Sequence, residues 1–478
     1  MLKKIIFLIL GIILVSCEKE EYYEFDIIDD TSITDTESLS DDVSSTIINS
    51  GPFTIKKNTQ ELLFSDGFTP QDATSLSHVH GNIHYEHNGN DYLFVSSSSS
   101  YDTSNNTIYS GHPLLYKRVQ EKWVLIKKFQ DVTLSMVRNY DISSDGIHFV
   151  VGDAPEHPPG SSLGVGIKSN IYFGKIQEDD IVFTKVNPSY PVWAHDVSIG
   201  DINQDGILDI LSTGDEFVIW YQNSDGSFTP DFDKIEYRRN WYMNLTIDLD
   251  DVNGDGSLEI ITGVYNFQPE TELYNNLQVY TIDPIDGIFK KTFQSTNPHE
   301  FIQGEMGAGK IRMHDMDNDG LKDAVVQREG RGIDYVSATE IWKNNGDGTF
   351  SRLDIFGSES EDTNGHYGYE VMDINNDGYN DIALIGFHWG SELRLQSPRI
   401  EFGFILNNLI WINQGDGTFQ KYTQRELIGG EGVEIDIFYP IMLGDKFKYI
   451  GKKPRIGAGA QIPDDRLESV IYEIDFDM

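Results

Sequence analysis

Four copies of one acidic nine-residue pattern constrain the fold of this chain more than any other feature. The pattern is D-x-[DN]-x-D-G-x-x-[DE], and it begins at Asp201, Asp251, Asp315 and Asp373. A fifth copy, over residues 141–149, has a phenylalanine where the last carboxylate would stand. Four such matches do not arise by chance, and their spacing of roughly sixty residues indicates a tandem repeat.

A second element follows each acidic pattern and is typical of a β-hairpin. Its clearest copies start at Trp220, Trp342 and Trp411 and pass through Asp-Gly to a phenylalanine. Asp-Gly between alternating apolar residues is a strong hairpin signal. Apolar residues also alternate before each acidic pattern, as at Val197 and Ile199. Each repeat therefore predicts four antiparallel strands, the content of one propeller blade.

The length of the repeat region sets the expected number of blades. The 428 residues from Gly51 to Met478 divide into seven units of about 61. We therefore predict an all-β fold over residues 51–478, a seven-bladed β-propeller of four-stranded antiparallel blades, with six or eight blades as alternatives. The last repeat lacks an outer strand, and a strand near 53–57 or 61–64 precedes the first repeat. We expect this N-terminal strand to close the last blade and remove its free edge.

The acidic patterns, which lie between strands one and two of a blade, predict metal loops. Side chains at positions 1, 3, 5 and 9 and the carbonyl at position 7 supply only oxygen, and glycine at position 6 permits the turn. Such ligands suit calcium better than magnesium, which demands octahedral geometry. Thirteen of the sixteen side chains are acids, so calcium should stabilise the fold; solvated Asp-Gly turns without an ion are the alternative. About four calcium ions are expected, held by Asp201, Asn203, Asp205, Ile207 and Asp209; Asp251, Asn253, Asp255, Ser257 and Glu259; Asp315, Asp317, Asp319, Leu321 and Asp323; and Asp373, Asn375, Asp377, Tyr379 and Asp381.

These repeats resemble the FG-GAP or VCBS-type family, the propellers of integrin alpha-chain heads and of many secreted bacterial proteins. The resemblance covers residues from about 78 to 425. It implies a propeller and calcium loops. It leaves the biological role open, because propellers serve as binding modules and as enzymes.

The first seventeen residues predict a lipoprotein signal peptide. Two lysines precede the apolar run 5–15, which is too short to span a bilayer. The next residues end in Leu-Val-Ser-Cys17, which resembles a bacterial lipobox whose cysteine thiol is acylated; an ordinary buried cysteine is the alternative. Residues 18–21 resemble an acidic export tag, and this likeness implies an outer-membrane lipoprotein that faces the exterior, with the membrane as a partner through the lipid. Residues 18–50 are acidic and rich in serine and threonine, and predict a flexible tether.

Charge and cysteine content exclude other classes of protein. The formal net charge is −41, from 36 basic and 77 acidic residues, which argues against nucleic-acid binding. Cys17 is the only cysteine, so a disulfide framework or a cysteine-based metal site is not expected.

Aromatic and histidine side chains are expected at the mouth of the central channel, on the side opposite the acidic loops. Aromatic faces beside polar groups suit sugar rings or a protein side chain; packing between blades is the alternative. The candidate ligand-binding residues are His78, His80, Trp193, His195, Trp241, Tyr242, His366, Tyr367, His388 and Trp389. Contacts between neighbouring inner strands are expected from Arg138, Ser198, Asp248, Arg312 and Glu370, each three positions before an acidic pattern.

The resulting functional prediction is a lipid-anchored, calcium-binding module at the cell surface, without enzymatic activity, that contacts a polysaccharide or a surface protein. A carbohydrate-active enzyme, such as a polysaccharide lyase that uses the central funnel, is one alternative, and an adhesin or assembly component is another. We assign no catalytic residue, because abundant carboxylates make any acid and base pair an arbitrary choice.

Overall fold

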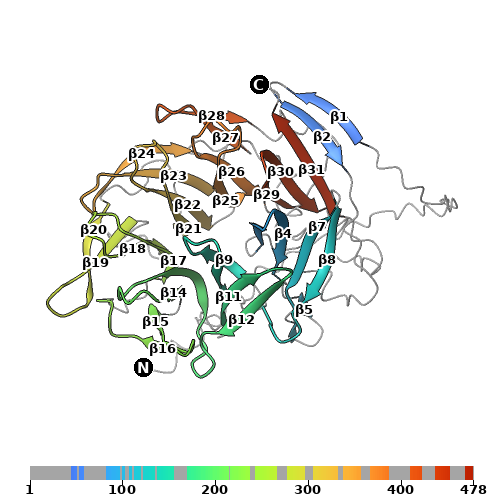
Figure 1. Ribbon diagram of the computed structural model, residues 1–478. Coiled ribbons are helices and arrows are strands. Elements are labelled where there is room, and N and C mark those ends of the chain that lie inside the picture. Colours follow the sequence, from blue (N-terminus) through green and yellow to red (C-terminus); the bar gives the residue numbers. More distant parts are fainter. Residues whose placement is uncertain are drawn as a thin grey trace, which may run out of the picture. The chain divides into compact units, whose positions relative to one another are not determined.

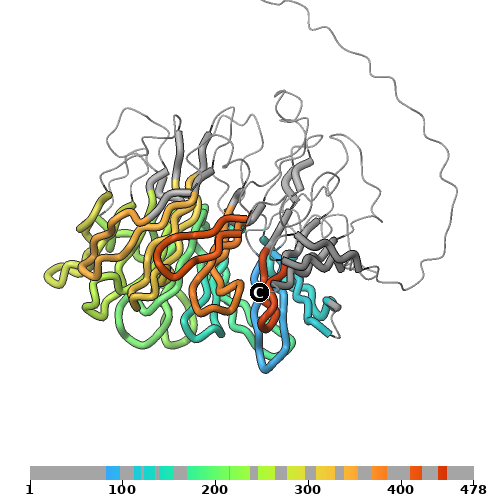
Figure 2. The backbone as a smooth tube through the Cα atoms, turned by 90° about the horizontal axis from the view of Figure 1, so that it is seen from above, coloured from blue at the N-terminus to red at the C-terminus, as the bar shows by residue number. Residues whose placement is uncertain are grey.

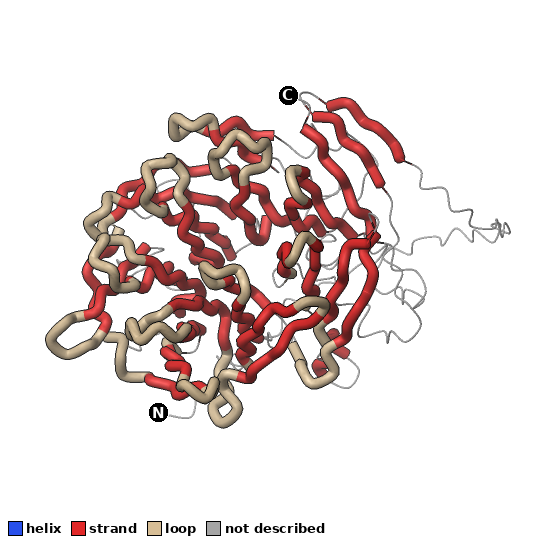
Figure 3. The backbone as a smooth tube through the Cα atoms, in the orientation of Figure 1, coloured by secondary structure: helices blue, strands red, loops and turns tan. Residues whose placement is uncertain are grey.

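In the computed structural model, every described element is a β-strand (Figure 3). The described residues are 45–50, 53–58, 82–96, 100–102, 107–109, 112–119, 122–134, 137–154, 170–214, 216–236, 243–265, 277–295, 305–331, 337–356, 366–386, 410–422, 437–452 and 469–476. Within these ranges there is no helix with the length and apolar character needed to cross a membrane. The predicted signal peptide, Cys17 and residues 18–44 of the predicted tether lie outside them.

Six four-stranded antiparallel sheets form the blades (Figure 1). From inner to outer strand they are β3 Ile83–His87, β4 Asn90–Val95, β7 Leu114–Val119 and β8 Lys122–Lys128; β9 Val137–Ile142, β10 His148–Asp153, β11 Ile171–Gln177 and β12 Asp180–Lys185; β13 Ala194–Gly200, β14 Asp209–Gly214, β15 Val218–Gln222 and β16 Phe228–Asp231; β17 Met243–Asp250, β18 Glu259–Tyr265, β19 Leu277–Ile282 and β20 Phe289–Gln294; β21 Glu305–His314, β22 Asp323–Arg331, β23 Ser337–Asn344 and β24 Phe350–Phe356; and β25 His366–Met372, β26 Asp381–Gly386, β27 Ile410–Asn413 and β28 Phe419–Tyr422. A separate pair joins β5 Ser100–Asp102 to β6 Thr107–Tyr109.

The prediction of seven four-stranded blades is wrong, because the structure has six. The segments near the two ends of the chain instead form one five-stranded sheet, in the order β1 Ser45–Ser50, β2 Phe53–Asn58, β31 Ser469–Phe476, β30 Lys446–Lys452 and β29 Ile437–Leu443. β2 pairs with β31 on one edge and with β1 on the other. A strand added to a sheet leaves a new free edge, and a further strand can pair with it. β1 consists of the last six residues of the predicted tether, so these residues form a strand.

Burial within a blade follows from its position between other blades. Every residue of the inner strand β13 is buried, as is every residue of β14, whereas the outer strand β16 is partly exposed. The apolar clusters also join consecutive blades: Val150 and Phe173 of one blade pack with Val197 and Trp220 of the next. A sheet covered on both faces needs apolar residues on both, which explains the short continuous apolar runs of the repeat.

The inner strands position the acidic loops on one side of the sheets. β13, β17, β21 and β25 each run directly into one acidic loop, which then leads into the second strand of the same blade. Because the strands alternate in direction, the Asp-Gly hairpins between the third and fourth strands lie at the same edge. Figure 2 shows the described turns gathered along one side.

Side chains at the fourth loop position connect successive loops. Gln204 Nε2 donates to the carbonyl of Gly256 at 3.0 Å, and Asn318 Nδ2 donates to that of Gly378 at 3.4 Å. Asn376 Nδ2 donates to the carbonyl of Asp445, in the turn between β29 and β30, at 3.0 Å. The first loop is thereby joined to the second, and the third to the fourth, whereas the second loop has Gly254 at this position.

Candidate functional site

The four acidic loops share one backbone conformation. The sixth residue is always glycine, with φ from 85° at Gly206 to 90° at Gly378, a region that glycine adopts without steric cost. The carboxylate at position one accepts a hydrogen bond from the amide of this glycine; Asp201 Oδ2 does so from Gly206 at 2.8 Å. The carboxylate at position five accepts a hydrogen bond from the amide of the residue at position seven, as Asp205 Oδ1 does from Ile207 at 2.8 Å. Glycine and these carboxylate-to-amide bonds therefore fix the turn.

The ninth-position carboxylates, Asp209, Glu259, Asp323 and Asp381, are fully buried. They accept backbone amides: Asp323 receives bonds from Met316 and Asn344, both at 2.9 Å. Burial, with a smaller contribution from neighbouring acids, raises the pKa of Asp209 and Asp323 to about 6 and that of Glu259 and Asp381 to about 7. A cation beside these groups would favour their charged forms and oppose this shift.

Three loop oxygens are buried without a hydrogen-bond partner among the described residues: Asp209 Oδ2, Asp315 Oδ1 and Asp317 Oδ1. In the third loop, oxygens of Asp315, Asp317 and Asp323 lie within 4.8 Å of one another. Leaving a buried carboxylate oxygen without a partner is costly, and converging oxygens are the ligands that calcium prefers. The residues present therefore fit calcium, which would offset part of their negative charge.

The remaining predicted ligands occupy equivalent places in each loop. At position three, the side-chain amides of Asn203, Asn253 and Asn375 each donate to the carboxylate at position five of the same loop, at 3.0, 3.1 and 2.8 Å. The seventh residues Ser257, Leu321 and Tyr379 donate their amides as Ile207 does, at 2.8 to 2.9 Å. Their role as metal ligands stays a prediction.

One lysine that the repeat pattern did not reveal lies against the third loop. Lys343 Nζ, from β23, makes ion pairs with Asp317 Oδ2 and with Asp319 Oδ2, the second at 2.7 Å. These bonds raise the pKa of Lys343 and lower that of Asp319. Only the pairing of β22 with β23, which brings residue 343 beside the loop, could have shown this contact.

The fifth, incomplete copy of the acidic pattern closes on its own side chains. Asp145 accepts bonds from Ser143 Oγ at 2.5 Å, the Ile147 amide at 2.8 Å and His148 Nδ1 at 2.8 Å. Although burial opposes the shift, these bonds lower the pKa of Asp145. Phe149, at the ninth position, is fully buried in an apolar cluster. This loop therefore has an apolar side chain where the others have a carboxylate.

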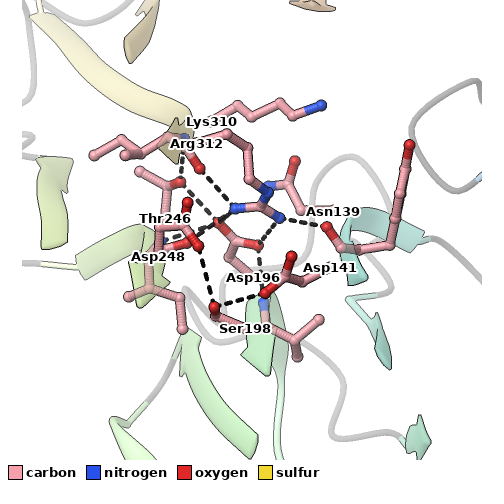
Figure 4. Close-up of polar contacts among 12 residues, drawn as sticks. Asn139, Asp141, Asp196, Ser198, Thr246, Asp248, Lys310 and Arg312 are labelled. Atoms are coloured by element: carbon pink, nitrogen blue, oxygen red, sulfur yellow. Dashed lines mark hydrogen bonds and ion pairs between the residues drawn. The ribbon is translucent and has the colours of Figure 1, made fainter. Parts of the chain in front are cut away.

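A buried polar network joins the inner strands at their centre, and Arg312 of β21 lies in its middle (Figure 4). Its guanidinium donates to both oxygens of Asp196, at 3.1 and 3.3 Å, to the Ile247 carbonyl at 2.9 Å and to the Tyr140 carbonyl at 2.5 Å. Burial alone would lower the pKa of Arg312, but Asp196, Asp248 and nearby Asp141 raise it further above its usual value. Arg312 thus reaches β9, β13 and β17 from a single side chain.

Carboxylates of this network also cap backbone amides of the next inner strand. Asp141 Oδ2 accepts the Ile199 amide at 2.9 Å, Asp196 Oδ2 that of Ile247 at 3.0 Å, and Asp248 Oδ2 that of Met313 at 2.8 Å. Each of these three blades therefore satisfies an amide at the inner edge of the blade that follows, which an isolated sheet would leave unpaired.

The inner-strand residues named from the sequence meet in this network, except Arg138, whose side chain is not among those described. Ser198 Oγ donates to Asp141 and Asp248 at 2.7 and 3.1 Å. Lys310, which sequence reasoning missed together with Asp196, pairs with Glu370 at 3.1 Å. Asp196 lies two residues before Ser198, on the same side of the strand, and that register is the signal that could have revealed it.

Of the ten predicted ligand-binding residues, Trp193 and His195 are the two whose side chains the structure describes. His78, His80, Trp241, Tyr242, His388 and Trp389 lie outside the described residues, and for His366 and Tyr367 the structure describes only the backbone at the start of β25. Trp193 and His195 are buried, and their rings meet edge to face with centroids 5.4 Å apart. Trp193 Nε1 is buried and has no hydrogen-bond partner among the described residues.

Comparison with known proteins supports the interpretation of the repeats. Residues 201–262 and 315–384 match the FG-GAP-like repeat family. Nothing among the curated proteins matches the chain. The solved Dos1 propeller is 11% identical, with 80% of this chain and 89% of that chain covered and a TM-score of 0.36. A protein from Lactobacillus plantarum is 11% identical, with 62% and 92% covered and a TM-score of 0.31. From its sheet topology and its matched repeats, the chain is an all-β propeller that carries FG-GAP-like repeats.

Proposed function

We propose that the chain is a calcium-stabilised binding module that holds a polysaccharide on the side opposite the acidic loops. Trp193 carries this proposal. It stands immediately before β13, at the end of the strand away from its acidic loop, and its indole N–H is buried without a partner. A buried donor of this kind usually has a partner, either water or a ligand. Because the ring itself is buried, the proposed contact is this N–H donating to a sugar hydroxyl rather than a sugar stacked on the ring face.

The lengths of the connections between strands also support a ligand site on the side opposite the acidic loops. Each acidic loop spans eight residues between its two strands, whereas the connection from the second to the third strand varies from three residues after β14 to 23 after β26. Variable connections on a uniform scaffold are where binding usually resides. The acidic loops, by contrast, keep one length and one conformation, as a structural metal site requires.

Replacing Trp193 with phenylalanine tests the ligand site, because the change removes the N–H and keeps an aromatic ring. We expect retention of the protein on at least one immobilised bacterial or plant polysaccharide in calcium, and about tenfold weaker retention of the W193F variant, as for one lost hydrogen bond in a closed site. Trp220→Phe is the matched control. It removes an indole N–H that bonds internally to Ser212 Oγ at 2.9 Å, so it should lower stability and leave retention unchanged.

The same polysaccharides should be recovered intact. Release of shortened or unsaturated sugars would show that the protein is an enzyme, and failure to retain any polysaccharide would contradict the proposed class of ligand. Equal retention of W193F and the parent protein would exclude Trp193 as the site.

We also propose that a lipid on Cys17 holds the module on the outer membrane, facing outward. The expected result is incorporation of a labelled fatty acid into the protein in a Gram-negative host and its recovery with membranes. Cys17→Ala should abolish both. Because Cys17 is the only cysteine, residual labelling in the variant would exclude thiol acylation as the anchor.

A further inference from the structure

The third acidic loop differs from the other three in charge. Its ligand side chains at positions 1, 3, 5 and 9 are four aspartates, whereas each of the other loops has three acids and an asparagine at position 3. The third strand of the same blade also differs. Lys343 follows Trp342, where the repeats of the other three acidic loops have the uncharged residues Tyr221, Thr281 and Ile412. The additional acid and the lysine therefore occur in the same blade.

The structure brings these two exceptions into contact. Lys343 Nζ pairs with Asp317, the additional acid, and with Asp319 at 2.7 Å. Two-thirds of the lysine side chain is buried, and the side chain of Asp317 is only 18% exposed. At the four ligand positions, the ammonium brings the net charge from −4 to −3, the value at the same positions of the other loops. Lys322, at position eight of this loop, has a 55% exposed side chain and pairs with Asp250 instead. An ammonium that is partly removed from water interacts more strongly with a neighbouring ion than one in bulk solvent.

The contact also coincides with a difference in hydrogen bonding. In the first loop the fifth-position amide donates to the first and third side chains: the Asp205 amide donates to Asp201 Oδ1 at 3.0 Å and to Asn203 Oδ1 at 2.9 Å. The corresponding oxygens of the third loop, Asp315 Oδ1 and Asp317 Oδ1, are buried without a partner among the described residues. Lys343 bonds the other oxygen of Asp317, Oδ2, so Oδ1 remains available to a metal ion.

We propose that Lys343 is a built-in counter-cation of the third loop, which lets this loop hold four carboxylates in the absence of calcium and lowers its affinity for the ion. This inference rests on the calcium sites of the proposed function. The ammonium reduces repulsion among the acids when calcium is absent, and it repels calcium when the ion approaches. Because of both effects, the stability of the third loop depends less on calcium than expected from its number of acidic side chains alone.

Lys343→Met removes the ammonium and keeps the length of the side chain. We expect calcium binding at one class of sites, measured by isothermal titration calorimetry, to tighten about tenfold, from the Coulomb energy of a unit charge near a divalent ion. The difference in melting temperature between calcium and chelator should increase as well. Lys343→Arg retains the charge and should resemble the parent protein. The double variant D317N/K343M gives the ligand positions of the third loop the charge of those in the other loops and should return both quantities towards the parent values.

A K343M variant with unchanged calcium affinity and an unchanged melting difference would overturn the role of Lys343, while a parent protein that responds to calcium would leave the proposed function intact. A parent protein that neither binds calcium nor responds to it would instead reject the calcium sites, and with them this inference. Tighter binding in K343M that persists undiminished in the double variant would also contradict the pairing with Asp317.

Discussion

Transfer of the protein from calcium into a chelator is expected to lower its melting temperature by at least about 5 °C. Binding to the folded state alone contributes about 2.7 kcal/mol per site when the ion is at a hundred times its dissociation constant. Four predicted loops with buried ninth-position carboxylates act together, so the combined effect should exceed that of most single substitutions. Differential scanning calorimetry in calcium, magnesium and chelator measures it, and equal melting temperatures in all three would contradict the metal sites.

The gain in stability from calcium should grow between about pH 5 and about pH 8. Unfolded carboxyls titrate near pH 4, whereas Asp209, Asp323, Glu259 and Asp381 have raised pKa values of about 6 to about 7. A carboxyl whose pKa is raised by folding contributes stability to the folded state. This contribution is complete below the pKa of the unfolded state, and it is lost as the pH rises through the pKa of the folded state. The calcium-free protein loses this contribution at high pH, and calcium offsets the loss by binding the charged forms.

Asp209→Asn is the matched control for the pH dependence. The amide keeps the oxygen that accepts the Gln222 amide at 2.9 Å and replaces Oδ2, which has no hydrogen-bond partner within the described part of the chain. The variant should gain less from calcium than the parent protein, and its gain should vary less with pH. A calcium gain that falls as the pH rises would be the opposite of the expected sign.

Arg312→Met is expected to reduce the free energy of unfolding by about 3 to 5 kcal/mol, the usual effect of removing one partner from a buried ion pair. The change leaves the buried Asp196 without its cation and removes the bonds to the Ile247 and Tyr140 carbonyls. Denaturant unfolding followed by tryptophan fluorescence provides the measurement. Arg352→Met, on the exposed face of β24, should change the free energy by less than about 0.5 kcal/mol.

A double-mutant cycle separates the ion pair from the packing of the long side chain. If the pair carries the effect, R312M in an Asp196→Asn background should cost much less than in the parent protein. Equal costs in the two backgrounds would assign the loss to packing and to the carbonyl bonds.

The blades could be predicted from the sequence because each is built from local signals. The acidic loop after β13 and the Asp-Gly hairpin after β15 are each encoded within about ten residues, and both lie where the pattern indicates. The number of blades could not be read in this way. It depends on β2, which β1 flanks, pairing with a strand more than 400 residues later, and nothing local specifies that contact.

The same distinction applies to the candidate site. The loop positions are set by spacing, so the buried carboxylates of Asp209 and its equivalents could be named in advance, and their role as metal ligands stays a prediction. Lys343, Lys310 and Asp196 act across strands or across blades, and each needs the register of neighbouring strands before its partner can be named. Arg312 was expected to contact adjacent strands only, but its guanidinium also reaches β9, two blades beyond its neighbour β17.

The pairing of β2 with β31 has a consequence for biosynthesis. Phe53 pairs with Phe476 and Asn58 with Ile471. At ordinary rates of translation, roughly 20 to 80 s separate the emergence of these two strands from the ribosome. Throughout that interval β2 has one free edge, to which a strand of another nascent chain could bind. Folding yield should therefore fall as the concentration of nascent chains rises, and a low level of expression favours the correct partner.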